Sequence, residues 1–169
     1  MSTDLRRNDL VISLIAGAAA GAVATWAMGK VTTWMYEREN VGARELEDAA
    51  RGGKTAYATA AEKAADTAGV ELSDEQRDTA GAGIHWALGI AGGAAYGLAR
   101  KRWPRAAAFY GAGFGLAFFL AMDELMNPVL GLTPGPMAFP WQAHARGLAG
   151  HLAYGVTSNA VLDAVDRVM

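Results

Sequence analysis

Four long stretches of this sequence carry no Asp, Glu, Lys or Arg, and they constrain the fold most. They are residues 10–29, 79–99, 106–122 and 147–162. A helix needs roughly 20 mostly apolar residues to cross a bilayer, and each stretch approaches or reaches that length. The mean hydropathy of the whole chain, +0.11, would also fit a soluble protein, so the placement of the charges decides the class. We expect an all-α fold, an integral membrane four-helix bundle.

The composition of these stretches allows one alternative to a membrane protein. They contain more alanine and glycine than leucine, so a soluble Ala/Gly-rich helical bundle is the alternative. By its length of 169 residues the chain is a single domain. The membrane helices are predicted at about residues 10–36, 74–99, 106–127 and 143–165.

Between the first two predicted helices, residues 37–73 form a short, charged external segment. Its alanine-rich middle favours a short helix on the surface of the membrane domain. Ser73 and Gln76 have the spacing of a capping box, in which each side chain satisfies a backbone amide of the other residue. The second membrane helix is therefore predicted to begin directly after Ser73.

A run of four bases without an acid, Arg100 to Arg105, follows the second predicted helix. Short basic loops stay in the cytoplasm. Both termini are therefore predicted to be cytoplasmic, and the pair Arg6 and Arg7 agrees with this orientation. Because the first apolar run extends to Tyr36, we interpret it as an uncleaved helix and not as a signal peptide.

Small residues recur at four-residue intervals on the first two predicted helices. They are Gly17, Gly21, Thr25 and Gly29 on the first, and Gly89, Gly93 and Gly97, in line with His85, on the second. Such stripes let helix backbones approach closely in lipid. We expect them to pack helices together, within the chain or between copies of it.

Ionisable side chains of the predicted spans gather in their outer halves. Such groups are costly inside a membrane and mark functional sites by default. Imidazole and carboxylate groups bind protons and divalent metals. The candidate site for a proton or a divalent metal ion consists of His85, Asp123, Glu124 and His151. The candidate supporting residues are His144, Arg146, Tyr154 and Lys30.

Each candidate also has a purely structural interpretation. His85 and His151 fit interhelical hydrogen bonds in a glycine-packed bundle. Asp123 and Arg146 fit an ion pair that fixes the register of two helices. The loop at 133–141 is either a turn with an interfacial tryptophan or a re-entrant gate.

Several short motifs carry a resemblance to a known family. They are His85-Trp86, Ala95-Tyr96-Gly97, Asp123-Glu124 with Pro128 and Gly131-Leu132, His144 with Gly147-Leu148, and His151 to Gly155. In these motifs, over about residues 80–156, the chain resembles the YagU-like inner-membrane proteins. The resemblance implies a multi-pass protein of the bacterial inner membrane and implies no reaction.

Three functional classes fit these patterns. The first is a proton or metal site that makes the protein acid-responsive or transport-like, and the second is a structural protein that assembles through its glycine stripes. The third, a membrane metallohydrolase, is the least favoured, because the sequence has no phosphate loop and no HExxH motif. The expected partners are the lipid bilayer and either a second copy of the chain or another membrane protein, with no nucleic acid. The absence of cysteine excludes thiolate chemistry.

Overall fold

The computed structural model describes residues 2–168, with side chains from Asp9 onward, and these residues form helices and no strands. The predicted all-helical class is confirmed. The side chains of Arg6 and Arg7, on which the predicted orientation partly rests, lie outside the described residues. The α-helices are α1 (Ser2–Tyr36), α2 (Val41–Arg51), α3 (Ala56–Thr67), α4 (Asp74–Arg102), α5 (Ala112–Phe119), α6 (Asn127–Val129) and α7 (Trp141–Val168).

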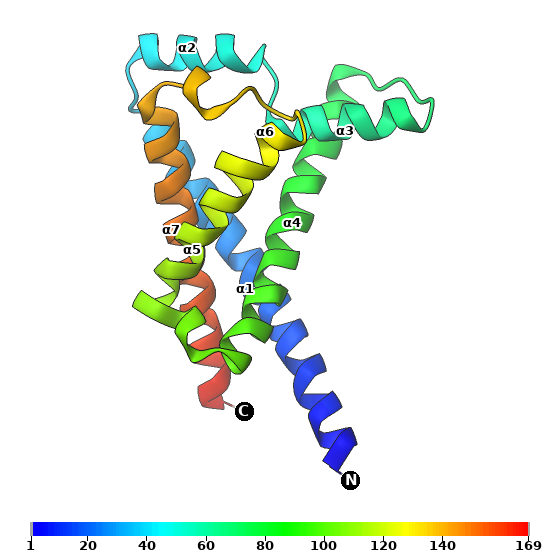
Figure 1. Cartoon of the computed structure of the whole chain (residues 1–169), viewed down its shortest axis with the longest axis vertical. Coiled ribbons are helices and arrows are strands. Elements are labelled where there is room, and N and C mark those ends of the chain that lie inside the picture. The colour runs from blue at the N-terminus through cyan, green and yellow to red at the C-terminus, as the bar shows by residue number, and fades with distance from the viewer. Residues whose placement is uncertain (1, 169) are drawn as a thin grey trace.

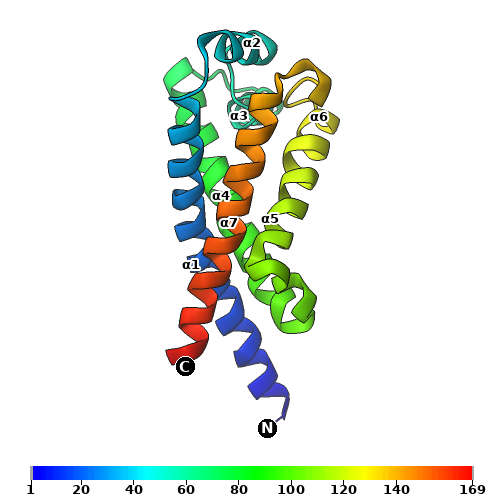
Figure 2. The same ribbon diagram turned by 90° about the vertical axis from the view of Figure 1, so that its left-hand side faces the viewer.

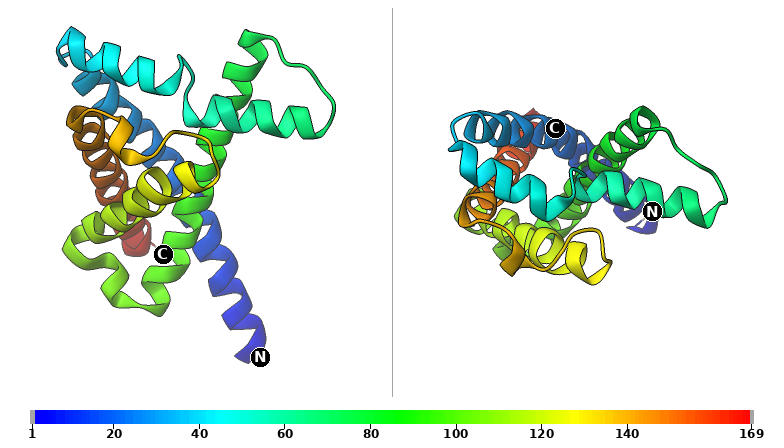
Figure 3. Two further views of the ribbon diagram at one scale, coloured as in Figure 1. Left: turned by 45° about the horizontal axis from the view of Figure 1, so that its top comes forward. Right: turned by 90° about the horizontal axis from the view of Figure 1, so that it is seen from above.

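The long helices run roughly along one axis, and α2 and α3 lie across one end of them (Figure 1). Turned by 90°, the molecule shows α1, α7 and the α5–α6 run side by side (Figure 2). Seen from above, α2 and α3 cover the end of the bundle (Figure 3). Both termini lie at the opposite end, so we call the two ends the α2 end and the termini end.

Within the described part of the chain, two stretches are long and apolar enough to cross a membrane, Asp9–Tyr36 and Pro104–Val129. Large apolar side chains on them point outward, such as Ile15 and Trp26 on α1 and Leu120 and Leu125 further along. The helix α4 does begin with the predicted capping box, in which Ser73 accepts from the Gln76 amide and the Gln76 side chain accepts from the Ser73 amide.

The glycine stripes form the crossing of α1 with α4. A Cβ atom added to Gly93 would collide with the backbone of Gly17 and Gly21, and one added to Gly97 would collide with Ser13 and approach Gly17 closely. The predicted role of these glycines in helix packing is confirmed, and the packing is within one chain. At Gly29 a Cβ would meet no atom within 4 Å, so this glycine lies outside the contact.

The third predicted helix, 106–127, departs from regular α-helix at both ends. Residues Pro104–Gly111 form a distorted 3₁₀ segment, η1, in which Phe109 and Tyr110 have φ angles of 53° and 57°. Left-handed residues cannot continue a right-handed helix, so the α-helix begins later, at Ala112. A π-helical segment, η2 (Leu120–Met126), then follows α5.

A hydrogen-bonded network joins α4 to α7 at the termini end. The Tyr96 hydroxyl donates to Asn159 Oδ1 at 2.8 Å. Arg100 pairs with Asp163 at 2.8 Å and with Asp166 at 2.6 Å. Because each of these charged groups has a partner of opposite sign, the network locks two long helices together.

Candidate functional site

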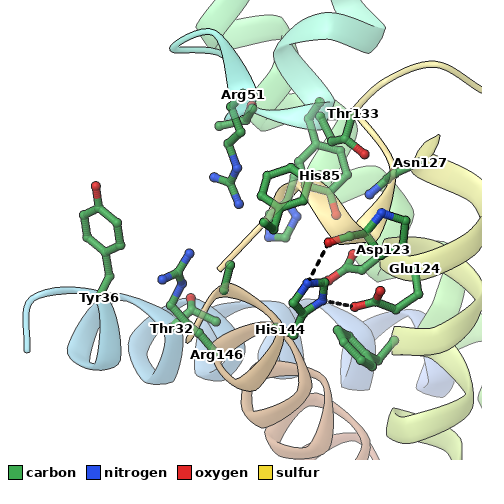
Figure 4. Close-up of a pocket in the computed structure, with 18 of the residues that line it drawn as sticks. Thr32, Tyr36, Arg51, His85, Asp123, Glu124, Asn127, Thr133, His144 and Arg146 are labelled. Carbon is green, nitrogen blue, oxygen red and sulfur yellow. Dashed lines mark hydrogen bonds and ion pairs between the residues drawn. The ribbon is translucent and has the colours of Figure 1, made fainter. Parts of the chain in front are cut away.

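A cavity of about 460 Å³ lies at the α2 end, and we call it the end cavity. The walls come from α1, α2, α3, α4, α5, η2, α6, α7 and the loop that precedes α7. Most of the labelled lining side chains in Figure 4 are polar: Thr32, Tyr36, Arg51, His85, Asp123, Glu124, Asn127, Thr133, His144 and Arg146. The cavity therefore brings together most of the candidate residues from the sequence.

The π-helical segment η2 positions both carboxylates. Successive residues of an α-helix point about 100° apart, so the sequence places Asp123 and Glu124 on different faces. A π-helix has wider turns, is rare, and occurs frequently at functional sites. In η2, both carboxylates line the end cavity.

Glu124 is in direct contact with His144. Its Oε1 atom lies 2.6 Å from His144 Nδ1, and His144 Nε2 lies 3.0 Å from the carbonyl oxygen of Pro136 (Figure 4). A carbonyl oxygen only accepts, so Nε2 carries a proton. The short contact at Nδ1 needs a second proton, which belongs either to the imidazole or to the carboxyl group. The geometry thus describes a neutral pair that shares one ionisable proton.

Asp123 faces the buried His151 at a longer distance. Its Oδ2 atom is 3.6 Å from His151 Nδ1, beyond a hydrogen bond, while Nδ1 donates to the Gly147 carbonyl at 3.0 Å. This nitrogen therefore bonds within its own helix and does not make the interhelical hydrogen bond of the structural interpretation. Asp123 consequently has an imidazole nearby but no hydrogen-bonded counterion among the described residues.

His85 reaches the cavity from α4 and contacts Tyr57 of α3. Their ring centroids are 4.8 Å apart. Burial, and next the negative charge of Asp123, raise the pKa of the Tyr57 hydroxyl, so this hydroxyl stays protonated. The wall of the cavity near Asp123 is therefore an aromatic side chain with a hydrogen-bond donor.

Arg146 does not pair with Asp123, and the predicted ion pair is wrong. Its guanidinium group contacts Glu39 and Glu47 at 2.5 Å, and Glu47 is fully buried. Glu47 also accepts from Arg51 at 2.5 Å. These acids come from the charged segment between the first two long helices, and their distance along the sequence gave no sign that they meet α7.

Two supporting candidates lie elsewhere. Lys30 is exposed on α1, with its ammonium group 5.8 Å from the centre of the Trp26 ring. Tyr154 is buried deeper in the bundle, where its hydroxyl donates to the Gly89 carbonyl at 2.5 Å. Neither residue lines the end cavity.

The candidate metal ligands contact other side chains and do not converge on one point. Among the described residues, no group of three or more histidine and carboxylate side chains is placed to hold a metal ion. Glu124 is engaged by His144, and His85 by Tyr57. A divalent metal stays a prediction without support from this geometry.

Sequence reasoning missed several residues of the site, namely Glu39, Glu47, Arg51, Tyr57 and Asn127. One signal was available. In α2 the buried residues are Ala43 and Glu47, one turn apart, so a charged residue occupies the face where apolar residues are usual.

The fold and the cavity define an all-helical protein with two membrane-compatible stretches and a polar chamber at one end of the bundle. The family described as "Protein of unknown function (DUF1440)" matches residues 58–160, more than half of the sequence, and the chain belongs to this family. No curated protein and no solved structure matches the chain. The match includes Asp123, Glu124 and His144, whereas Glu47 and Arg51 lie before it.

Proposed function

We propose that this protein is a multi-pass protein of the bacterial inner membrane that binds and releases a proton at the Glu124–His144 pair. In this proposal α1, α4, α5 with η2, and α7 span the bilayer. The α2 end faces outward and both termini face the cytoplasm. Support comes from the two membrane-compatible stretches, from the outward-pointing apolar side chains, and from the basic run Arg100 to Arg105 near the termini end.

The contact between Glu124 and His144 carries the proposal. Two protons are needed to satisfy both nitrogen contacts of this imidazole, and the carbonyl of Pro136 fixes one of them on Nε2. The other proton lies in a 2.6 Å contact on the wall of a chamber. A histidine changes charge within the physiological range of pH, which suits a group that exchanges protons with an external compartment.

The test is a pH titration of the imidazole groups by ¹⁵N NMR, on the full chain in nanodiscs. Over the range from about pH 5 to 8, we expect the shifts of the His144 nitrogens to follow the loss of the proton shared with Glu124. Glu124→Gln should alter that titration, while Glu75→Gln, an exposed acid at the start of α4, should leave it as in wild type. Constant His144 shifts over this range would refute the proton site.

The membrane topology has a separate test. Single cysteines introduced at Lys54 and Arg102 should react with impermeant reagents from opposite sides of the membrane. Labelling of both from the same side would contradict the proposed topology and would leave the proton site to be judged by the titration alone.

A role in assembly through the glycine stripes is the alternative function. One observation weighs against it: Gly17, Gly21, Gly93 and Gly97 already contact each other within a single chain. They are covered by the α1–α4 crossing and leave no stripe of this kind on the surface of those two helices for a second copy.

A further inference from the structure

We infer that the end cavity binds a small organic cation, a protonated alkylamine, whose ammonium group pairs with Asp123 and whose binding is opposed by protons. This inference deepens the proposed function and rests on it, because the proton and the amine would share one chamber.

The size of the chamber points to an organic ligand. Its volume, about 460 Å³, falls within the roughly 300–1,000 Å³ of sites for small molecules. A proton or a bare metal ion needs far less space. The residues that would hold a metal do not converge in groups of three in the described part of the chain.

The charges on the walls select a cation. Arg146 and Arg51 are paired with Glu39 and Glu47, so these four groups sum to zero. The Glu124–His144 pair, described above, is neutral while it holds its shared proton and negative after it has lost that proton. Asp123 is left, with its side chain 30% exposed and the His151 imidazole 3.6 Å away, beyond a hydrogen bond. A partly buried carboxylate without a hydrogen-bonded counterion is costly, and a bound cation would lower that cost.

One further acidic side chain adds negative charge to the cavity. Asp48 lines the cavity from the exposed side of α2, and the described contacts give it no basic partner. Because glutamates behind the wall neutralise both of its arginines, Asp48 and Asp123 leave the chamber with a net negative charge, which favours cations over carboxylates or phosphates.

The polar groups near Asp123 match the donors of an ammonium group. An ammonium group has three N–H donors and no acceptor, so it needs several acceptors around it. The carboxylate of Asp123, the amide oxygen of Asn127 and the hydroxyl of Thr133 all belong to the lining.

The apolar part of the ligand also has a surface to contact. Met28, Tyr57 and Phe119 line the same chamber. The rings of Tyr36 and Phe139 are engaged by arginines, at 5.0 Å from Arg146 and 5.9 Å from Arg51. The aromatic wall that is open to an alkyl chain is thus on the side of Asp123.

Protons oppose the amine because they add positive charge to the chamber. The titratable and charged groups around Asp123, on every element that packs against it, are Glu124, His144, His151, Tyr57, His85 and Arg51. Gaining a proton on an imidazole or a carboxyl group makes the lining less negative. The affinity for an alkylammonium should therefore be lower at about pH 5 than at about pH 8.

The experiment is isothermal titration calorimetry of the full chain in detergent, with n-butylammonium as the probe. Butyrate serves as the anion of matched size, and Zn²⁺ as the metal. We expect heat from butylammonium at pH 8, none from butyrate, and an affinity about tenfold lower in Asp123→Asn. Asp66→Asn, an exposed acid of α3, is the matched control and should bind as wild type does.

One further variant and one further measurement distinguish a loss of binding from a folding defect. Asp123→Glu keeps the charge and should keep binding, and helical circular dichroism of each variant should equal that of wild type. The inference is overturned if butylammonium gives no heat, if butyrate binds as tightly, if Asp123→Asn binds as wild type does, or if only Zn²⁺ binds.

The two proposals fail in different ways. An imidazole titration of His144 without butylammonium binding would refute the organic cation and leave the proton site standing. Butylammonium binding that is the same at pH 5 and pH 8, with constant His144 shifts, would refute the proton site and the competition together.

Discussion

The two ends of the bundle use the same kinds of side chain for different purposes. At the termini end, Arg100 is bonded to two aspartates and to Asn159, with no sizeable cavity between them. At the α2 end, Asp123 faces a chamber of about 460 Å³ with no hydrogen-bonded counterion. The comparison teaches that residue type alone does not identify a site in a helical bundle. Open space beside an uncompensated charge does.

The largest effect on stability is expected at the ion pairs that hold the α2 end together. Arg146→Met keeps the volume of the side chain but leaves Glu39 without its charge partner and the buried Glu47 with Arg51 alone. Removing one member of a buried ion pair costs about 3–5 kcal/mol. We expect a loss of this size in unfolding by denaturant, and none for the exposed Arg105→Ala. An unchanged midpoint would mean that the chamber does not depend on this cluster.

The second prediction tests the crossing of α1 with α4, which joins the two ends of the bundle. Gly93→Leu would force α1 away from α4, since no side chain fits between them, and overpacking of this kind costs about 1–3 kcal/mol. Gly29→Leu is the matched control, because it points into open space. Equal melting temperatures for the two variants would show that the stripe carries no packing.

The third effect contrasts the ends directly. Asp163→Asn weakens the pairing of Arg100 and should lower stability by about 1 kcal/mol or less, because Asp163 is partly exposed. Asp123→Asn should leave stability unchanged or raise it, since it removes a carboxylate without a counterion. Chemical denaturation of both variants measures the difference. A larger loss for Asp123→Asn would reverse our assignment of the two roles.

The smallest effect is spectroscopic. Trp141 begins α7 at the α2 end, and Trp103 follows α4 at the termini end. In variants with a single tryptophan, acidification from about pH 8 to about pH 5 should shift the emission of Trp141 and not that of Trp103. Replacing Glu124 with Gln should suppress the shift. Equal responses at the two ends would remove the distinction between them.

The sequence predicted what depends on local pattern. The charge-free stretches and the four-residue glycine spacing were enough to indicate helices that pack by close backbone contact, as at Gly93. The capping box at Ser73 was equally local, because both of its partners lie within one turn.

The sequence could not predict contacts between residues that lie far apart along the chain. Glu39 and Glu47 meet Arg146 about a hundred residues later, and only the placement of α2 over the end of the bundle brings them together. The left-handed backbone at Phe109 and Tyr110 was also hidden, since neither residue type favours it. Of the four candidate site residues, Asp123, Glu124 and His85 line one chamber, while His151 lines a small second cavity that also contacts His85.

The π-helical segment η2 has a consequence for how this chain tolerates changes in length. A π-turn holds one residue more than the α-turn that it replaces, so a deletion of a single codon between Phe119 and Asn127 would restore an ordinary helix. Such a protein would fold with a more regular third helix, but the residues after the deletion would turn by about 100° around the helix axis relative to α5. The additional residue of η2 thus sets the direction in which the two carboxylates face relative to α5.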